Sequence, residues 1–114
     1  MLAKKYRLTD SNDFAKVQTQ GTTFQSINFG VAILDRKDAE PPRFAFIVST
    51  KIAKDAVDRN TIRRHMSETV RLMTSEVKNG LDIVFLAKTG IMRVPADSIV
   101  REVRAAVRAS GITK

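Results

Sequence analysis

The feature that most limits how this chain can fold is the order of apolar patterns in its second half. Residues 44–49 and 81–87 are almost wholly apolar and are typical of buried strands. Between them, apolar residues recur every three or four positions, as on one face of a helix: Ile62, Met66, Val70, Met73 and Val77. This strand, helix, strand order, followed by another helical pattern, predicts an α/β fold with helices packed on a sheet.

Local signals place the ends of these elements. The long helix is expected to start near Asp55, a capping residue, and to end at Asn79 and Gly80. We expect residues 44–49 to form a central strand, covered on both faces, and the helix that joins it to 81–87 allows the two strands to be parallel. Residues 95–108 predict a closing helix with one apolar and one basic side. Ile99, Val100, Val103 and Val107 face inward, and Arg101, Arg104 and Arg108 lie opposite.

The first half predicts one short helix and one strand. Capping residue types at positions 9–12 precede the apolar pattern of Phe14, Ala15 and Val17. Gly21 is expected to stop this helix in a left-handed conformation. Residues 24–34 favour a strand, and the charged segment 35–42, which ends in two prolines, favours a loop.

The charge of the chain indicates its kind of partner. The net charge is +8 over 114 residues, which favours a polyanion, nucleic acid before an anionic membrane. There is no cysteine, and no segment has the ~20 apolar residues that a membrane span needs. We therefore expect a single domain over residues 1–114, located in the cytoplasm, with no membrane and no stable protein partner.

A basic constellation follows the apolar strand and runs into the long helix. Asn60, Arg64, Ser67 and Arg71 fall on one helical arc away from the apolar stripe, whereas Arg59 falls on the apolar side and is expected to reach outward from the first turn. A guanidinium presents a planar fork that matches two phosphate oxygens. The competing interpretation is a merely solvated basic face. The candidate RNA-binding residues are Lys51, Lys54, Arg59, Asn60, Arg63, Arg64 and Arg71.

These residues carry a resemblance to a known family. The stretches Arg43-Phe-Ala-Phe-Ile-Val-Ser-Thr-Lys51, Ala56-Val-Asp-Arg-Asn60 and Ile62-Arg-Arg64 resemble the signature of the bacterial ribonuclease P protein family. Asp13-Phe14, Gly21-Thr22, Phe29 and the stretch 82–88 extend the similarity along the chain. The resemblance implies a two-layer α/β sandwich with a four-stranded sheet, the order αβββαβα and a left-handed βαβ crossover, like ribosomal protein S5 domain 2.

The resemblance also implies a function. Family members bind the catalytic RNA of ribonuclease P and the 5′ leader of precursor tRNA, and so assist endonucleolytic removal of the leader. The RNA carries the chemistry with Mg²⁺ that it holds itself, so no catalytic or metal-binding residue is expected in this chain. The leader is expected in a cleft between the first helix and the sheet, lined by Phe14, Lys16, Val17, Phe29 and Val31.

Several positions depart from the family pattern. Thr61 and Ser67 stand where further arginines are usual, and Thr50 where a second lysine is common. The RNA contact is therefore expected to involve fewer cationic residues, or to be shifted onto Arg71 and the closing helix. Gln18 and Ala32 replace frequent aromatics of the cleft, for which Phe24 is a possible substitute.

Two other functions stay open from the sequence. One is a non-catalytic RNA-binding module, such as a ribosomal or ribosome-assembly protein of the same fold. The other is an interfacial protein whose basic helices lie on anionic lipid, although its apolar stripes are better used in a core. His65, the only histidine, has no partnered nucleophile and is weak evidence for catalysis.

Overall fold

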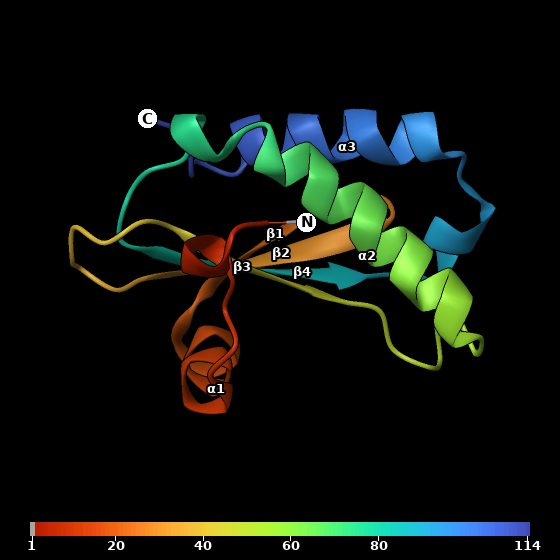
Figure 1. Cartoon of the computed structure of the whole chain (residues 1–114), viewed down its shortest axis with the longest axis horizontal. Helices are drawn as coiled ribbons and strands as arrows, with labels where there is room; N and C mark the ends of the chain where they lie inside the picture. Colours follow the sequence, from red (N-terminus) through yellow and green to blue (C-terminus); the bar gives the residue numbers. More distant parts are fainter. Residues whose placement is uncertain (1) are drawn as a thin grey trace.

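The computed structural model describes residues 2–114 and contains a four-stranded sheet with helices on both faces (Figure 1). Helices α2 and α3 cover one face, and α1 lies against the other. The elements are η1 (Lys4–Tyr6), α1 (Ser11–Gln20), β1 (Thr22–Gln25), β2 (Phe29–Asp35), β3 (Arg43–Ile47), α2 (Ala56–Arg71), η2 (Thr74–Glu76), β4 (Leu81–Ala87), η3 (Thr89–Arg93) and α3 (Ala96–Ala109). The predicted α/β class and the order αβββαβα are confirmed.

The sheet has the strand order β1-β2-β4-β3. Strands β1, β2 and β4 pair antiparallel, whereas β3 and β4 are parallel neighbours joined through α2. The expectation of a central strand at 44–49 is wrong, because β3 is an edge strand and β4 is central. The side chains of β3 are nevertheless covered on both faces, because Phe44 and Phe46 pack in one core and Ala45 and Ile47 in the other, while the N-terminal segment covers part of the strand's outer edge. There the Leu8 N–H donates to the Phe44 carbonyl at 2.8 Å.

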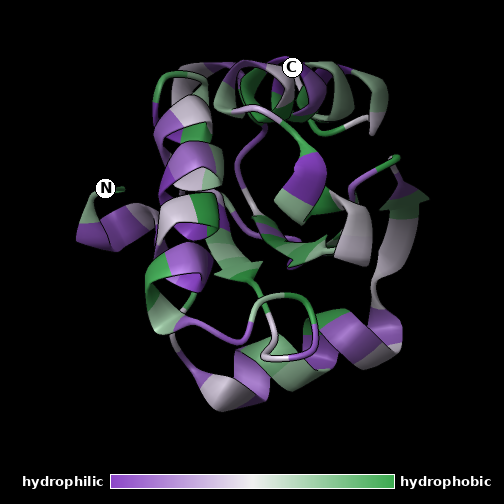
Figure 2. Cartoon of the chain, turned by 90° about the vertical axis from the view of Figure 1, so that its right-hand side faces the viewer, coloured by the Kyte–Doolittle hydropathy of each residue, from purple (hydrophilic) through white to green (hydrophobic). Residues whose placement is uncertain are grey.

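Two hydrophobic cores follow from the alternation of side chains along the strands. The larger core lies between the sheet and α2 and α3, and contains Phe29, Val31, Phe44, Ile83 and Phe85. The smaller core lies on the α1 side. It joins Val17 to Ala32 and Val84, with half-buried apolar side chains around them: Phe14, Leu34, Ala45, Ile47 and Leu86. Figure 2 shows the hydrophobic colour on the strands at the centre of the molecule and much of the hydrophilic colour on the helices.

Helix α2 starts where the sequence predicts and ends earlier. Asp55 caps it by accepting a hydrogen bond from the Val57 N–H at 2.9 Å. It ends at Arg71, so the expected end at Asn79 and Gly80 is wrong. The apolar pattern continued past the helix because Met73 and Val77 are buried in the same core from the irregular segment around η2.

Other boundaries in the first half also differ. A turn at residues 26–28 divides the expected strand 24–34 into β1 and β2. Gly21 follows α1 with a φ of −77°, so the expected left-handed stop is wrong. A glycine is needed there because a Cβ would lie 2.5 Å from the Val17 carbonyl oxygen and 2.7 Å from that of Ile33. The predictions of β4 and of the basic outer side of α3 are confirmed.

No helix within residues 2–114 has the length and apolar character needed to cross a membrane.

Candidate RNA interface

The first half of α2 presents polar and basic side chains at the sheet edge formed by β3. Asn60 and Arg64 are exposed, and Arg63 is half-buried and donates a hydrogen bond to Asn60 Oδ1. These residues, together with Phe46 and Ser67, line a cavity of about 290 Å³. Helical spacing brings Asn60 and Arg64 to one face, as the sequence predicts.

The loop before α2 supplies two more cations. Lys51 and Lys54 are exposed, while Ala53 between them is buried and anchors the loop in the core. Arg59 Nη1 donates to the carbonyl oxygens of Ala53 and Lys54, at 2.9 and 2.8 Å. The expectation that Arg59 reaches outward is therefore wrong. Its guanidinium turns back and holds the loop against the first turn of α2.

Carboxylates leave this surface largely unneutralised. Within residues 2–114, no ion pair joins Lys51, Lys54, Arg63 or Arg64 to an acidic side chain. Arg71, about two helical turns beyond Arg64, differs because its Nε lies 2.9 Å from Glu68 Oε2. We call Lys51, Lys54, Asn60, Arg63 and Arg64 the α2 interface, and Arg71 lies at its margin.

The α1 side of the sheet brings together only part of the expected leader cleft. Phe14 and Val17 pack on the sheet from α1, and Lys16 is exposed beside them. Phe29 and Val31 are 0% and 1% exposed in the core under α2 and α3, so their assignment to a cleft beside α1 is wrong. The reason is the two-residue alternation of β2, which turns Ala32 and Leu34 toward α1 instead.

Other apolar side chains on this side of the sheet were not predicted from the sequence. Ala45, Ile47 and Leu86 are half-buried, so α1 covers this part of the sheet incompletely. In Figure 1, α1 lies below one end of the sheet and the loop into α2 hangs below the other. We call Phe14, Lys16, Val17, Ala45, Ile47 and Leu86 the α1 face. Alternation along β3 and β4 was the signal for these residues, but it does not say which side α1 occupies.

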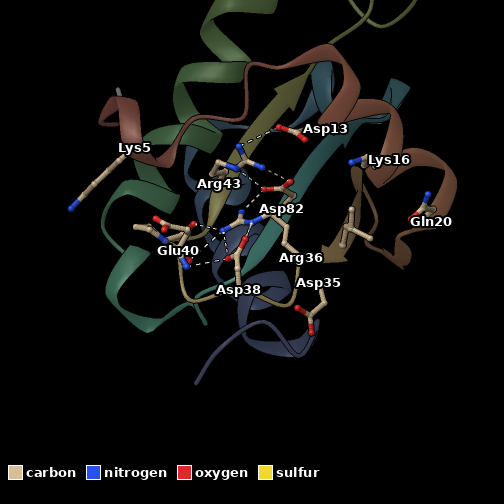
Figure 3. A pocket seen from close by; sticks show the side chains of 12 residues that line it. Lys5, Asp13, Lys16, Gln20, Asp35, Arg36, Asp38, Glu40, Arg43 and Asp82 are labelled. Atoms are coloured by element: carbon tan, nitrogen blue, oxygen red, sulfur yellow. Dashed lines mark hydrogen bonds and ion pairs between the residues drawn. The ribbon is translucent and has the colours of Figure 1, made fainter.

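A second group of charges, at the amino ends of β3 and β4, was not expected from the sequence (Figure 3). Asp82 is 1% exposed, and its two carboxylate oxygens accept from Arg43 Nε and Nη2, each at 2.8 Å. Arg36 also donates to Asp82, and Arg43 Nη1 lies 3.2 Å from Asp13 Oδ2. We call Asp13, Arg36, Asp38, Arg43 and Asp82 the Asp82 cluster.

Every N–H of the Arg36 guanidinium in the Asp82 cluster has an acceptor within the protein. Nε and Nη2 donate to the Asp38 carboxylate, Nη1 donates to Asp82 and the Leu81 carbonyl, and Nη2 also donates to the Pro41 carbonyl. The Arg36 hydrogen bond lowers the pKa of Asp38, and the hydrogen bond from Arg43 to Asp82 raises the pKa of Arg43. The cluster borders a cavity of about 680 Å³, but its arginine donors are largely consumed inside the fold.

The described residues offer no evident metal centre. No group of three histidine, aspartate or glutamate side chains within residues 2–114 is arranged to hold an ion. The carboxylates of Asp82 and Asp38 are already engaged by arginines.

The fold and the α2 interface together define a class: a small, basic α/β protein with a cationic surface suited to a polyanion. Comparison with known proteins identifies the family within this class. A family model described as Ribonuclease P matches residues 2–110. The chain is 31% identical over 113 residues to the ribonuclease P protein component of Gluconacetobacter diazotrophicus, with 98% of this chain and 97% of that protein covered. It is 35% identical over 105 residues to that of Oleidesulfovibrio alaskensis, with 90% and 83% covered.

Solved structures agree with this assignment at the level of the fold. The RNase P protein of Staphylococcus aureus superposes with a TM-score of 0.89 at 22% identity, over 97% of this chain and 100% of that one. The RNase P protein of Thermotoga maritima gives 0.79 at 22% identity, over 90% and 94%. The chain belongs to the ribonuclease P protein family, the protein subunits of a ribonucleoprotein endoribonuclease of tRNA processing.

Proposed function

We propose that this chain binds the catalytic RNA of ribonuclease P through the α2 interface and the single-stranded 5′ leader of precursor tRNA through the α1 face. The observation that carries the proposal is the set of exposed or half-buried cations on α2 and its preceding loop that have no carboxylate partner among the described residues. Cations of this kind neutralise phosphates and release counterions, which gives most of the affinity for RNA. Their fixed spacing on a helix limits the entropy lost on binding.

The chemistry in this proposal belongs to the RNA. Mg²⁺ held by the RNA would supply an activated water for cleavage at the leader junction, and no metal ligand is assigned to the described residues of this chain. The cations of the α2 interface reduce the repulsion between the two RNA molecules in the cytoplasm. The apolar side chains of the α1 face, with Lys16 beside them, suit the bases and backbone of an unpaired strand.

Reconstitution tests this function. The protein is mixed with a bacterial ribonuclease P RNA at a Mg²⁺ concentration too low for the RNA to act alone, and cleavage of precursor tRNA is followed. We expect cleavage to be restored by the natural chain and by Lys37→Gln, an exposed cation outside both surfaces, but not by the Arg63→Gln/Arg64→Gln variant. Binding of RNA without restored cleavage would favour the non-catalytic RNA-binding module instead.

The leader contact has a separate test in Phe14, which is half-buried on the α1 face. Phe14→Ala should weaken binding of leader-bearing tRNA about tenfold, the scale of one base stacked on an aromatic ring, while mature tRNA is unaffected. Phe14→Tyr keeps the ring and should bind the leader as the natural chain does. Equal losses for both tRNAs would mean that Phe14 only packs the smaller core.

A further inference from the structure

The cavity beside α2 has an aromatic wall that the phosphate contacts of the α2 interface do not use. Phe46 on β3 lines it, together with Asn60, Arg63, Arg64 and Ser67 of α2, and its volume is about 290 Å³. Phe46 is half-buried, whereas Phe44, two residues earlier on the same strand, is 2% exposed. The ring of Phe46 is therefore a wall that a ligand can reach, and the ring of Phe44 is not.

The Phe46 ring is held in place from behind. It stacks on Phe85 of the central strand, with ring centroids 5.2 Å apart and an interplanar angle of 23°. Phe85 is completely buried and also packs against Phe29, at 5.6 Å. A flat ring entering the cavity would meet an aromatic side chain that is already fixed, and a rigid aromatic platform loses little entropy on binding.

The rest of the rim is polar and cationic. Arg63 and Arg64 provide guanidinium groups with no carboxylate partner among the described residues. Asn60 Oδ1 accepts from Arg63, and the amide group still has two N–H donors for an acceptor on a ligand. The cavity therefore combines a surface for a flat ring, a donor for its edge and two cations for an anion.

We propose that this cavity binds one unpaired nucleotide of the partner RNA, with its base on Phe46, its base edge at Asn60 and its phosphate at Arg63 and Arg64. An extruded base stacked on an aromatic ring is the usual way in which proteins read single-stranded RNA. The proposal rests on the RNA-binding function proposed above. It adds that the α2 interface recognises an unstacked base as well as phosphate charge.

The nucleotide chemistry fits this cavity better than other occupants do. A purely apolar ligand would leave two guanidinium groups desolvated without a partner, which is costly. A simple anion would gain nothing from the aromatic wall. A nucleotide is the ligand class that uses the ring, the amide and the cations together.

A minimal ligand tests the cavity directly by NMR on the full chain. We compare adenosine monophosphate with ribose 5-phosphate, which has the same phosphate but no base. Adenosine monophosphate should shift the Phe46 ring signals as well as those of Asn60 and Arg63, and should bind at least about fivefold more tightly than ribose 5-phosphate. Equal affinities and the same shifts for both ligands would overturn the proposal.

Binding to ribonuclease P RNA supplies the second readout, with a matched control on the same strand. Phe46→Leu should weaken RNA binding about five- to twentyfold without changing its salt dependence, because stacking is not ionic. Phe46→Tyr should stay within about twofold of the natural chain. Phe44→Leu removes a fully buried ring from the same strand and core, so it should affect folding but not RNA affinity.

The outcomes separate this proposal from the function on which it rests. If Arg63→Gln/Arg64→Gln lowers the salt dependence but Phe46→Leu leaves affinity unchanged, RNA binding stands and the nucleotide site is overturned. Equal losses for Phe46→Leu and Phe44→Leu would also overturn it, because they would reflect core packing. If Arg63→Gln/Arg64→Gln changes nothing, the RNA-binding function itself fails.

Discussion

Arginines have opposite roles at the two ends of the parallel pair β3 and β4: they are bound within the fold at one end and available to a ligand at the other. At the amino ends, Arg36 and Arg43 converge on the buried Asp82 and donate nearly all their hydrogen bonds within the fold. At the carboxyl end of β3, the chain passes through Lys51 and Lys54 into α2, where Arg63 and Arg64 have no carboxylate partner among the described residues.

This comparison shows that positive charge in a sequence does not by itself indicate binding. An arginine whose donors are all satisfied internally has none left for a phosphate and contributes to folding. An exposed arginine without a partner adds little to stability but is ready for an anion. Burial and partners therefore separate the two roles, and both the Asp82 cluster and the α2 interface can be tested on that basis.

The largest expected effect is at the Asp82 cluster. Asp82→Asn removes the buried carboxylate charge that two arginines share, and breaking such a buried ion pair costs about 3 kcal/mol. Urea denaturation measures this loss, and Glu40→Gln, an exposed acid nearby, should change stability by less than about 0.5 kcal/mol. While it remains folded, Asp82→Asn should bind RNA with the natural salt dependence. A loss of stability below about 1 kcal/mol would contradict a structural role for the cluster.

A smaller effect is expected at Arg59, whose guanidinium donates within the fold, as Arg36 does, but holds the loop that carries Lys51 and Lys54. Arg59→Gln removes the donor to the Ala53 and Lys54 carbonyls and should destabilise the chain by about 1 kcal/mol. RNA affinity should fall several-fold because Lys51 and Lys54 lose their fixed geometry. Arg59→Lys keeps the charge but lacks the guanidinium fork, so it should be destabilised similarly and keep the natural salt dependence. Full stability in Arg59→Lys would show that the loop does not need this contact.

The sequence could predict the elements of the second half because their patterns are local. Asp55 signals the start of α2 by capping, and the apolar run at 81–87 matches β4. The end of α2 could not be predicted, because Met73 and Val77 keep the helical spacing while they reach the core from irregular chain. A periodic pattern reports burial, and burial does not require a helix.

The candidate sites also differ in how far they could be predicted from the sequence. Asn60 and Arg64 were predictable because one helix sets their relation. The misplacement of Phe29 and Val31 arose because alternation defines two faces of β2 but does not say which one α1 covers. The Asp82 cluster joins residues 39 and 46 positions apart, so only the folded sheet brings them together.

The smallest expected effect concerns pH. The Arg36 guanidinium lowers the pKa of Asp38 below its ordinary value of 3.8. A carboxyl whose pKa is lowered by folding adds stability above its unfolded pKa and loses that contribution as pH falls through the folded pKa. The difference in stability between the natural chain and Asp38→Asn should therefore be constant above about pH 5 and shrink below about pH 4. Denaturation curves at several pH values measure it, and a difference that grows toward acid would contradict the ion pair.

The central claim is that the α2 cations with no carboxylate partner among residues 2–114 bind RNA phosphates. The salt dependence of RNA binding tests this claim most directly. The slope of log K against log salt concentration is compared for the natural chain, Lys37→Gln and Arg63→Gln/Arg64→Gln. We predict that the double variant reduces the magnitude of the slope by about 1.5, while Lys37→Gln leaves it unchanged. An unchanged slope in the folded double variant would contradict the claim.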